Sequence, residues 1–189
     1  MKFVITMART PSNMVSLGTL APSFKLLNTI NNETIISDSY FNKKGTIIMF
    51  ICNHCPFVIH VLDEIISITK KYDKEISFIA ISSNDIVNYP EDSPELMKKL
   101  AEEKKFNFPY LFDETQEVAK KYDAACTPDF FVYNSEKQLV YRGQLDDSRP
   151  GNDVPVTGHD LRKAIESLMK GEKIDKNQKP SIGCNIKWK

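Results

Sequence analysis

The stretch "FICNHCPFVIHV", residues 50–61, places two cysteines three positions apart and a proline directly after the second. A short β-branched run, "GTIIMFI", leads into it, and apolar residues at helical spacing follow from Phe57 to Ile66. Proline is favoured at the first position of a helix, because its missing N–H needs no partner there. We therefore expect a strand, a turn that carries both cysteines, and a helix that begins at Pro56 with Cys55 as its N-cap.

A sulfur at a helix N-terminus faces unpaired backbone amides and the positive end of the helix dipole, which favour thiolate over thiol. Cys55 is therefore the expected nucleophile. Cys52 lies near enough to close a disulfide with it, so Cys52 is the expected resolving thiol. A C-x-x-C between a strand and a helix of a βαβ pattern indicates redox chemistry more strongly than the spacing alone.

The rest of the chain repeats the strand–helix order. "EISFIAIS" predicts a buried strand, and Ser93 with Pro94 predicts the start of a helix. Strands that alternate with helices indicate a parallel sheet. Two alternating segments around "NN" in residues 24–37 predict a β-hairpin, and residues 129–143 predict two strands about a polar turn, so the sheet is expected to be mixed.

The last predicted helix lies in "TGHDLRKAIESLMKG", residues 157–171. Thr157 and Asp160 stand at the positions of a capping box, and Gly171 is a C-terminal stop signal.

"FICNHCPFV" and, about 70 residues later, "ACTPDFFVY" resemble the thioredoxin superfamily, specifically its peroxiredoxin-like thioredoxin-fold proteins (the redoxin, or alkyl hydroperoxide reductase and thiol-specific antioxidant, type). The resemblance implies a thioredoxin-like α/β fold: a mixed central β-sheet flanked by helices, with an N-terminal β-hairpin extension. It covers residues 15–170, expected to form one domain. Residues 1–14 would be an N-terminal extension, and residues 171–189 a C-terminal tail packed on the domain.

The resemblance also implies roles for single residues. Pro128 matches the cis proline of the superfamily, so the Thr127–Pro128 bond is expected to be cis, with the Thr127 backbone free to pair with an extended substrate. Cys55-Pro56 matches the peroxidatic Cys-Pro of peroxiredoxins. Cys52 stands where those enzymes have threonine, and Arg142 is only a weak match to their activating arginine. These departures favour disulfide exchange over rapid peroxide reduction.

Each remaining histidine and cysteine has more than one interpretation. His54 would either stabilise the thiolate and tune the dithiol or simply be exposed, whereas His60 is expected to face solvent or be capped. Cys126, two residues before the expected cis proline, is either a third redox thiol or a small buried side chain. Cys184 is a second accessory thiol candidate, and a Cys126–Cys184 disulfide is an open hypothesis.

Composition limits the classes of partner. The 25 basic and 25 acidic residues cancel, so no global field would attract nucleic acid, and no apolar run is long enough for a transmembrane helix. The opening residues lack the pattern of a secretion signal, and Met7 is an alternative start with residues 1–6 as an extension. Four cysteines are too few for a disulfide scaffold. We therefore expect a cytoplasmic protein.

The sequence predicts a thiol–disulfide oxidoreductase without metal or organic cofactor, in which Cys52 and Cys55 exchange electrons with protein or small-molecule disulfides and with an upstream thiol reductant. His54, Pro56, Cys126, Thr127 and Pro128 are expected to shape the site. One alternative is a thiol peroxidase. The other is a zinc-stabilised, non-catalytic interaction module, in which Cys126, Cys184, His54 or His60 completes a site begun by the C-x-x-C.

Overall fold

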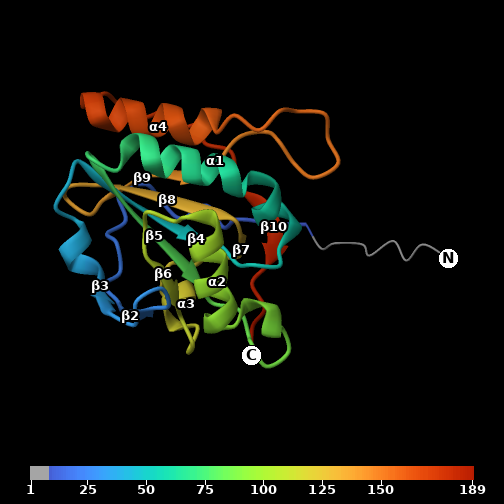
Figure 1. The fold of residues 1–189 in the computed structure, drawn as a ribbon. Helices are drawn as coiled ribbons and strands as arrows, with labels where there is room; N and C mark the ends of the chain where they lie inside the picture. The colour runs from blue at the N-terminus through green and yellow to red at the C-terminus, as the bar shows by residue number, and fades with distance from the viewer. Residues whose placement is uncertain (1–8) are drawn as a thin grey trace.

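The computed structural model describes residues 9–189 (Figure 1); the alternative start at Met7 and residues 1–6 lie outside this range. Seven strands form the main sheet, three short strands form a second sheet, and four α-helices flank them. The strands are β1 (Thr10–Pro11), β2 (Lys25–Asn28), β3 (Thr34–Ile36), β4 (Gly45–Phe50), β5 (Ile76–Ser82), β6 (Tyr110–Phe112), β7 (Cys126–Thr127), β8 (Asp129–Asn134), β9 (Leu139–Gly143) and β10 (Ile182–Asn185). The helices are α1 (Pro56–Tyr72), α2 (Pro94–Lys104), α3 (Glu117–Lys121) and α4 (His159–Lys170).

The main sheet has the order β3-β2-β6-β5-β4-β8-β9, and it is mixed as expected. Strands β4, β5 and β6 run parallel, because a helix carries the chain back between each pair. The predicted hairpin is present as β2 and β3, and the predicted pair about a polar turn is β8 and β9. Both hairpins pair antiparallel strands at the two sides of the parallel core.

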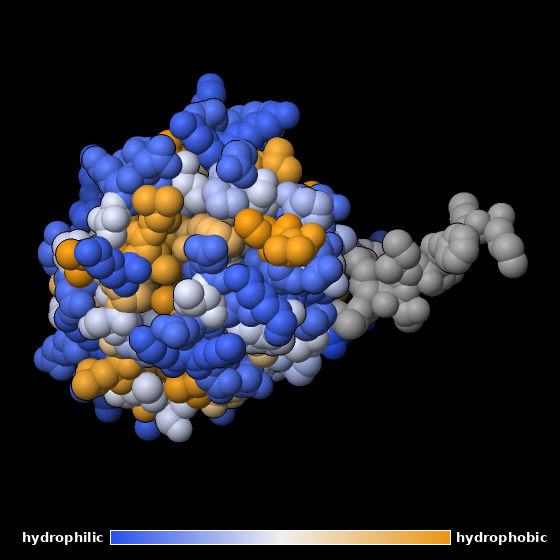
Figure 2. All heavy atoms as spheres, turned by 90° about the horizontal axis from the view of Figure 1, so that it is seen from below, coloured by the Kyte–Doolittle hydropathy of each residue, from blue (hydrophilic) through white to orange (hydrophobic). Residues whose placement is uncertain are grey.

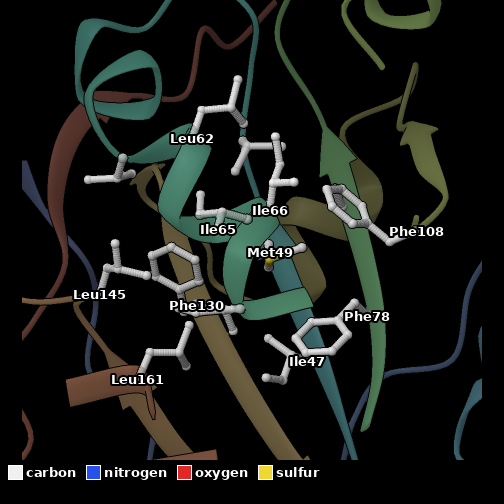
Figure 3. Close-up of a cluster of buried hydrophobic side chains, with 14 of the residues drawn as sticks. Ile47, Met49, Leu62, Ile65, Ile66, Phe78, Phe108, Phe130, Leu145 and Leu161 are labelled. Atoms are coloured by element: carbon white, nitrogen blue, oxygen red, sulfur yellow. The ribbon is translucent and has the colours of Figure 1, made fainter. Parts of the chain in front are cut away.

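Buried side chains form one apolar cluster on each face of this sheet. Helices α1, α2 and α4 contribute to the first cluster, which Figure 3 shows around Ile65, Met49 and Phe130. Helix α3 contributes to the second cluster. Strand β4 is completely buried because it is central in the sheet and covered on both faces. Its C-terminal end leads directly to the two cysteines.

The start of α4 differs from the capping box predicted at Thr157 and Asp160. Gly158 is the N-cap residue, with φ 64° and no side-chain cap. The amides of Thr157 and Gly158 instead donate to Oδ2 of Asp146, at 2.7 Å each. A carboxylate brought by the preceding long loop thus replaces the local cap. The predicted stop at Gly171 is confirmed, since this residue has φ 70° at the C-cap.

The C-terminal segment forms the second sheet. Strand β10 lies between β1 and β7 and is antiparallel to both, and Figure 1 shows it beside the N-terminal end of α1. Figure 2 shows mostly hydrophilic residues with separate hydrophobic patches on the face seen from below. Within residues 9–189, none of the helices combines the length and apolarity that crossing a membrane requires.

Candidate active site

The two cysteines lie between β4 and α1, where the sequence predicted them. Cys55 is the N-cap of α1, with an extended backbone (φ −70°, ψ 119°), and Pro56 is the first helical residue. The Cys55 side chain makes no capping hydrogen bond, so the N-terminal end of the helix acts on this sulfur through its dipole. Cys52 follows the end of β4 by two residues. The predicted N-cap position is confirmed.

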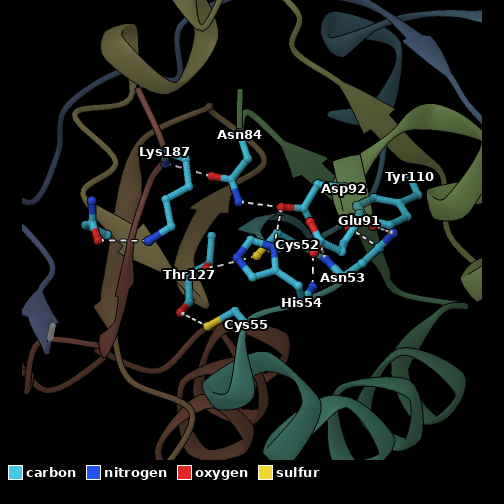
Figure 4. Close-up of polar contacts among 11 residues, drawn as sticks. Cys52, Asn53, His54, Cys55, Asn84, Glu91, Asp92, Tyr110, Thr127 and Lys187 are labelled. Atoms are coloured by element: carbon cyan, nitrogen blue, oxygen red, sulfur yellow. Dashed lines mark hydrogen bonds and ion pairs between the residues drawn. The ribbon is translucent and has the colours of Figure 1, made fainter. Parts of the chain in front are cut away.

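Thr127 contacts both sulfurs, as Figure 4 shows. Its hydroxyl Oγ1 lies 3.4 Å from Cys52 Sγ, and its carbonyl oxygen lies 3.2 Å from Cys55 Sγ. The Thr127–Pro128 peptide bond is cis, as expected from the resemblance. Strand β7 therefore brings Thr127 to the dithiol from a segment about 70 residues away in the chain.

The thiol pKa values of the pair shift in opposite directions. Hydrogen bonds from the thiols of Cys184 and Cys52, with a smaller contribution from the backbone of Val58, lower the pKa of Cys55 far below its ordinary value. The hydrogen bond to Cys55 and then burial raise the pKa of Cys52. Burial raises the pKa of Cys55, but the neighbouring groups outweigh it, and the Thr127 side chain contributes to the lowering. The surroundings therefore favour ionisation of Cys55 over ionisation of Cys52.

Both sulfurs of the C-x-x-C are enclosed. Cys52 is 1% exposed and Cys55 is 0% exposed, whereas Cys184 is half-buried. Strand β10, which carries Cys184, packs against α1. A substrate disulfide therefore reaches Cys55 only when atoms that cover it move aside.

Asp92 binds the loop between the two cysteines, a role that the sequence did not reveal. Its Oδ1 accepts from the amides of Asn53 and His54, at 2.7 and 3.3 Å. Its Oδ2 accepts from Asn84 Nδ2 at 2.7 Å and lies 2.6 Å from His54 Nδ1. The carboxylate is fully buried; desolvation raises its pKa, but the hydrogen bonds from His54 and Asn84 oppose this and leave the pKa lowered overall. Asp92 is thus an ionised anchor for the C-x-x-C turn.

His54 is held by Asp92 (Figure 4), and one of its ring nitrogens lies within 4.8 Å of Cys52 Sγ. Its ring stacks on Tyr89 with 5.6 Å between ring centroids and 7° between planes. The hydrogen bond to Asp92 raises the pKa of His54 above its usual range. The histidine is therefore a positioned, half-buried partner of the carboxylate. His60 lies farther along α1, where its Nε2 is 2.7 Å from Ser148 Oγ.

The C-terminal residues are tied to the same network. Asn84, in the loop after β5, accepts from the Lys187 amide at 2.8 Å while it donates to Asp92. The Lys187 carbonyl accepts from the Asp85 amide at 2.8 Å. Residues beyond β10 thus connect to the dithiol loop through a single asparagine.

The two remaining cysteines occupy different environments. Cys126 is buried, its Sγ lies 3.7 Å from the Pro128 carbonyl oxygen, and burial raises its pKa. Cys184 is directly opposite Thr127 in the β7–β10 ladder, whereas Cys126 is opposite Asn185. All four cysteines are free thiols.

Arg142 does not contact the dithiol. Its guanidinium is fully buried beside Asp129, 3.8 Å from the carboxylate, and lies over the Phe131 ring. Burial raises the pKa of Asp129 to about 7, against the opposing effect of Arg142. No activating role at Cys55 follows for this arginine.

One group of side chains has the spacing of metal ligands. Single ligand atoms of Cys52, His54 and Asp92 lie within 4.8 Å of one another. Cys126, Cys184 and His60, the other ligands considered from sequence, are not in this group. Nδ1 of His54 and both oxygens of Asp92 also have hydrogen-bond partners in the network of the dithiol loop.

Comparisons with known proteins show the family and the fold of this chain. The AhpC/TSA family model matches residues 17–142. An uncharacterized conserved protein from Geobacillus kaustophilus is 54% identical, with a TM-score of 0.95 and 98% of each chain covered. The hypothetical protein SMc02350 from Sinorhizobium meliloti 1021 is 41% identical, with a TM-score of 0.93, 95% of this chain and 98% of that chain covered.

A thiol:disulfide interchange protein of the thioredoxin family from Chlorobium tepidum TLS shares 15% identity and a TM-score of 0.62, with 82% of this chain and 99% of that chain covered. At this identity the likeness concerns the fold, which is thioredoxin-like. A search of curated proteins finds no match. Because the family model spans well over half of the residues, the chain belongs to the AhpC/TSA family.

Proposed function

We propose that the protein is a thiol–disulfide oxidoreductase in which Cys55 attacks and Cys52 resolves. The observation that carries the proposal is the placement of Cys55 at the N-terminus of α1, with Cys52 and Thr127 beside it. The opposite directions in which the pKa values of the two thiols shift agree with it. A thiolate is the reactive form of cysteine in disulfide exchange, so the ionised sulfur attacks first.

The reaction balances with these two thiols alone. The Cys55 thiolate attacks one sulfur of a substrate disulfide, and the other sulfur leaves as a thiolate. Cys55 then carries no charge, which removes the main cause of the raised pKa of Cys52. The ionised Cys52 attacks Cys55 Sγ, releases the second substrate sulfur and closes the Cys52–Cys55 disulfide. Two electrons pass to the substrate, and an upstream thiol reductant regenerates the dithiol.

The substrates are disulfides of proteins or small molecules, and the cis-proline segment supports docking of an extended chain. The expectation that the Thr127 backbone is free is wrong, because β10 pairs with β7 there and places Cys184 opposite Thr127. An extended substrate would pair with this segment only after β10 moves aside. Four cysteines, too few for a disulfide scaffold, suit a reducing compartment such as the cytoplasm.

The test is reduction of a protein disulfide, with insulin as the substrate and dithiothreitol as the reductant. We expect Cys55→Ser to abolish the catalysed rate and Cys126→Ser, the matched control at a buried cysteine, to retain it. Mapping of the oxidised wild type should place a disulfide between Cys52 and Cys55. Full activity in the Cys55→Ser variant would refute the proposal.

A thiol peroxidase is the second candidate, because the family match and the low pKa of Cys55 also suit attack on peroxide. Cys52 replaces the threonine of the peroxiredoxin pattern, and Arg142 is paired with Asp129 away from Cys55. These two features favour disulfide exchange. Stopped-flow oxidation of the reduced protein by hydrogen peroxide separates the candidates, since rapid sulfenic acid formation at Cys55 would favour the peroxidase.

A further inference from the structure

Cys184 is the second thiol that faces Cys55. In an antiparallel ladder, residues directly opposite each other project their side chains to the same face. Cys184 is opposite Thr127, and the Thr127 side chain contacts Cys52. Cys184 therefore projects toward the dithiol, in agreement with its place in the apolar cluster that contains Cys52 and Cys55.

Close packing of β10 holds Cys184 in this position. A Cβ at Gly183 would lie 2.0 Å from the Thr127 carbonyl oxygen, so the strand backbone approaches Thr127 as closely as a glycine permits. The same carbonyl lies 3.2 Å from Cys55 Sγ. In agreement with this placement, Cys184 makes the largest contribution to the lowered pKa of Cys55.

Cys184 also differs from the other thiols in exposure. It is half-buried, whereas Cys52, Cys55 and Cys126 are buried. A partly exposed thiol beside the enclosed nucleophile can exchange its proton with solvent and can also react with Cys55. Cys126 lacks this position, because it is opposite Asn185 and its sulfur contacts the Pro128 carbonyl.

We propose that Cys184 is a second resolving thiol, which forms a Cys55–Cys184 disulfide in competition with the Cys52–Cys55 disulfide. This inference rests on the proposed function, since it needs Cys55 as the nucleophile. Once Cys55 is joined to a substrate sulfur, the Cys184 thiol loses its proton to solvent and its thiolate attacks Cys55 Sγ. The bond between Cys55 and the substrate breaks, the substrate leaves as a thiolate, and two electrons have passed from the Cys55–Cys184 pair to the substrate disulfide.

The same pair can form from the closed dithiol. Cys184 thiolate attacks Cys55 Sγ of the Cys52–Cys55 disulfide, and Cys52 leaves as the thiolate, with no net oxidation. The C-terminal strand would then be joined covalently to the start of α1. The second disulfide thus gives the oxidised protein a form in which β10 is held on the active site.

The test uses oxidised glutathione as the disulfide and the Cys52→Ser chain as the background. We compare Cys52→Ser, Cys52→Ser/Cys184→Ser and the matched control Cys52→Ser/Cys126→Ser by intact mass and by peptide mapping without reductant. Cys52→Ser and the Cys126 control should release glutathione and contain a Cys55–Cys184 disulfide. The Cys184 double variant should retain one glutathione on Cys55.

Retention of glutathione to the same extent in all three variants would overturn the role of Cys184 and leave the proposed function intact. A Cys55–Cys126 disulfide in the Cys52→Ser chain would do the same. Absence of any adduct at Cys55, even in the Cys184 double variant, would instead refute Cys55 as the nucleophile. A Cys52→Ser/Cys184→Ala chain, checked for native circular dichroism, separates loss of the thiol from an effect of serine on folding.

Discussion

At the scale of single residues, Asp92 and Cys55 represent two different kinds of predictability. Cys55 precedes a proline and a helical pattern, so its N-cap position follows from local sequence. Asp92 contacts Asn53 and His54 across 38 or 39 positions in the chain. Nothing in the local pattern of "YPEDSP" distinguishes this buried carboxylate from the exposed Glu91 beside it. The helix-start residue was therefore predictable and its anchor was not.

Replacement of Asp92 by asparagine tests the anchor. The two carboxylate oxygens of Asp92 contact four donor groups. Asparagine has only one side-chain acceptor oxygen, and its NH₂ group would point at donors that it cannot satisfy. We expect the free energy of unfolding to fall by about 1–3 kcal/mol for each buried donor left without an acceptor. We also expect the pKa of His54 to fall, because its largest upward contribution is lost.

Denaturant unfolding and an NMR titration of His54 measure these effects. Glu91→Gln is the control: it keeps the backbone carbonyl that accepts from Asn53 Nδ2, and it removes only the last and smallest of the contributions to the raised pKa of His54, so this pKa should fall less than in Asp92→Asn. An Asp92→Asn chain with wild-type stability and an unchanged His54 pKa would contradict the role of the carboxylate.

At the scale of elements, the order of strands and helices was predictable. The spacing of hydrophobic residues and the Gly and Pro residues that end an element are both visible in short stretches of sequence. The hairpin β2–β3 and the pair β8–β9 confirm this. The start of α4 was predicted wrongly, since Asp146 supplies the acceptor from outside the helix. The pairing of β10 with β7 could not be predicted from local sequence patterns either, because it joins segments more than 50 residues apart.

The pairing of β10 with β7 predicts the effect of Gly183→Ala. The added Cβ would lie 2.0 Å from the Thr127 oxygen and 2.6 Å from its carbonyl carbon, so the two strands must separate. We expect a loss of about 1–3 kcal/mol in the free energy of unfolding, the range for overpacked sites. We also expect faster alkylation of Cys55 by iodoacetamide, because β10 packs against α1 beside this sulfur.

Ile182→Val, which trims a side chain on the same strand without bringing in a backbone clash, is the control for the glycine variant. Peptide mapping of the alkylated chains identifies the modified cysteine. If Cys55 in Gly183→Ala reacts no faster than in the control, the strand does not restrict access to the dithiol.

At the scale of the whole molecule, the fold brings three remote segments to the dithiol. The ends of β4 and α1 supply the cysteines, β7 supplies Thr127, the loop after β5 supplies Asn84 and Asp92, and β10 supplies Cys184. The sequence predicted the first two from motifs and resemblance. It left Cys184 among several interpretations, because the register of a terminal strand depends on tertiary contacts.

The central claim is that Cys55 is ionised in the reduced protein at neutral pH. An ultraviolet titration of thiolate absorbance measures this directly and needs no reagent to reach the buried sulfur. Reduced wild type should show one thiolate per chain below about pH 7, where an ordinary thiol of pKa about 8.5 is protonated. Cys55→Ser should lack this thiolate, and Cys184→Ala, which removes the donor, should shift its titration to higher pH, since Cys184 is the main cause of the lowered pKa. Cys126→Ser, the control, should titrate like wild type. A wild-type chain with no thiolate below about pH 8, or a Cys55→Ser chain that keeps it, would contradict the account.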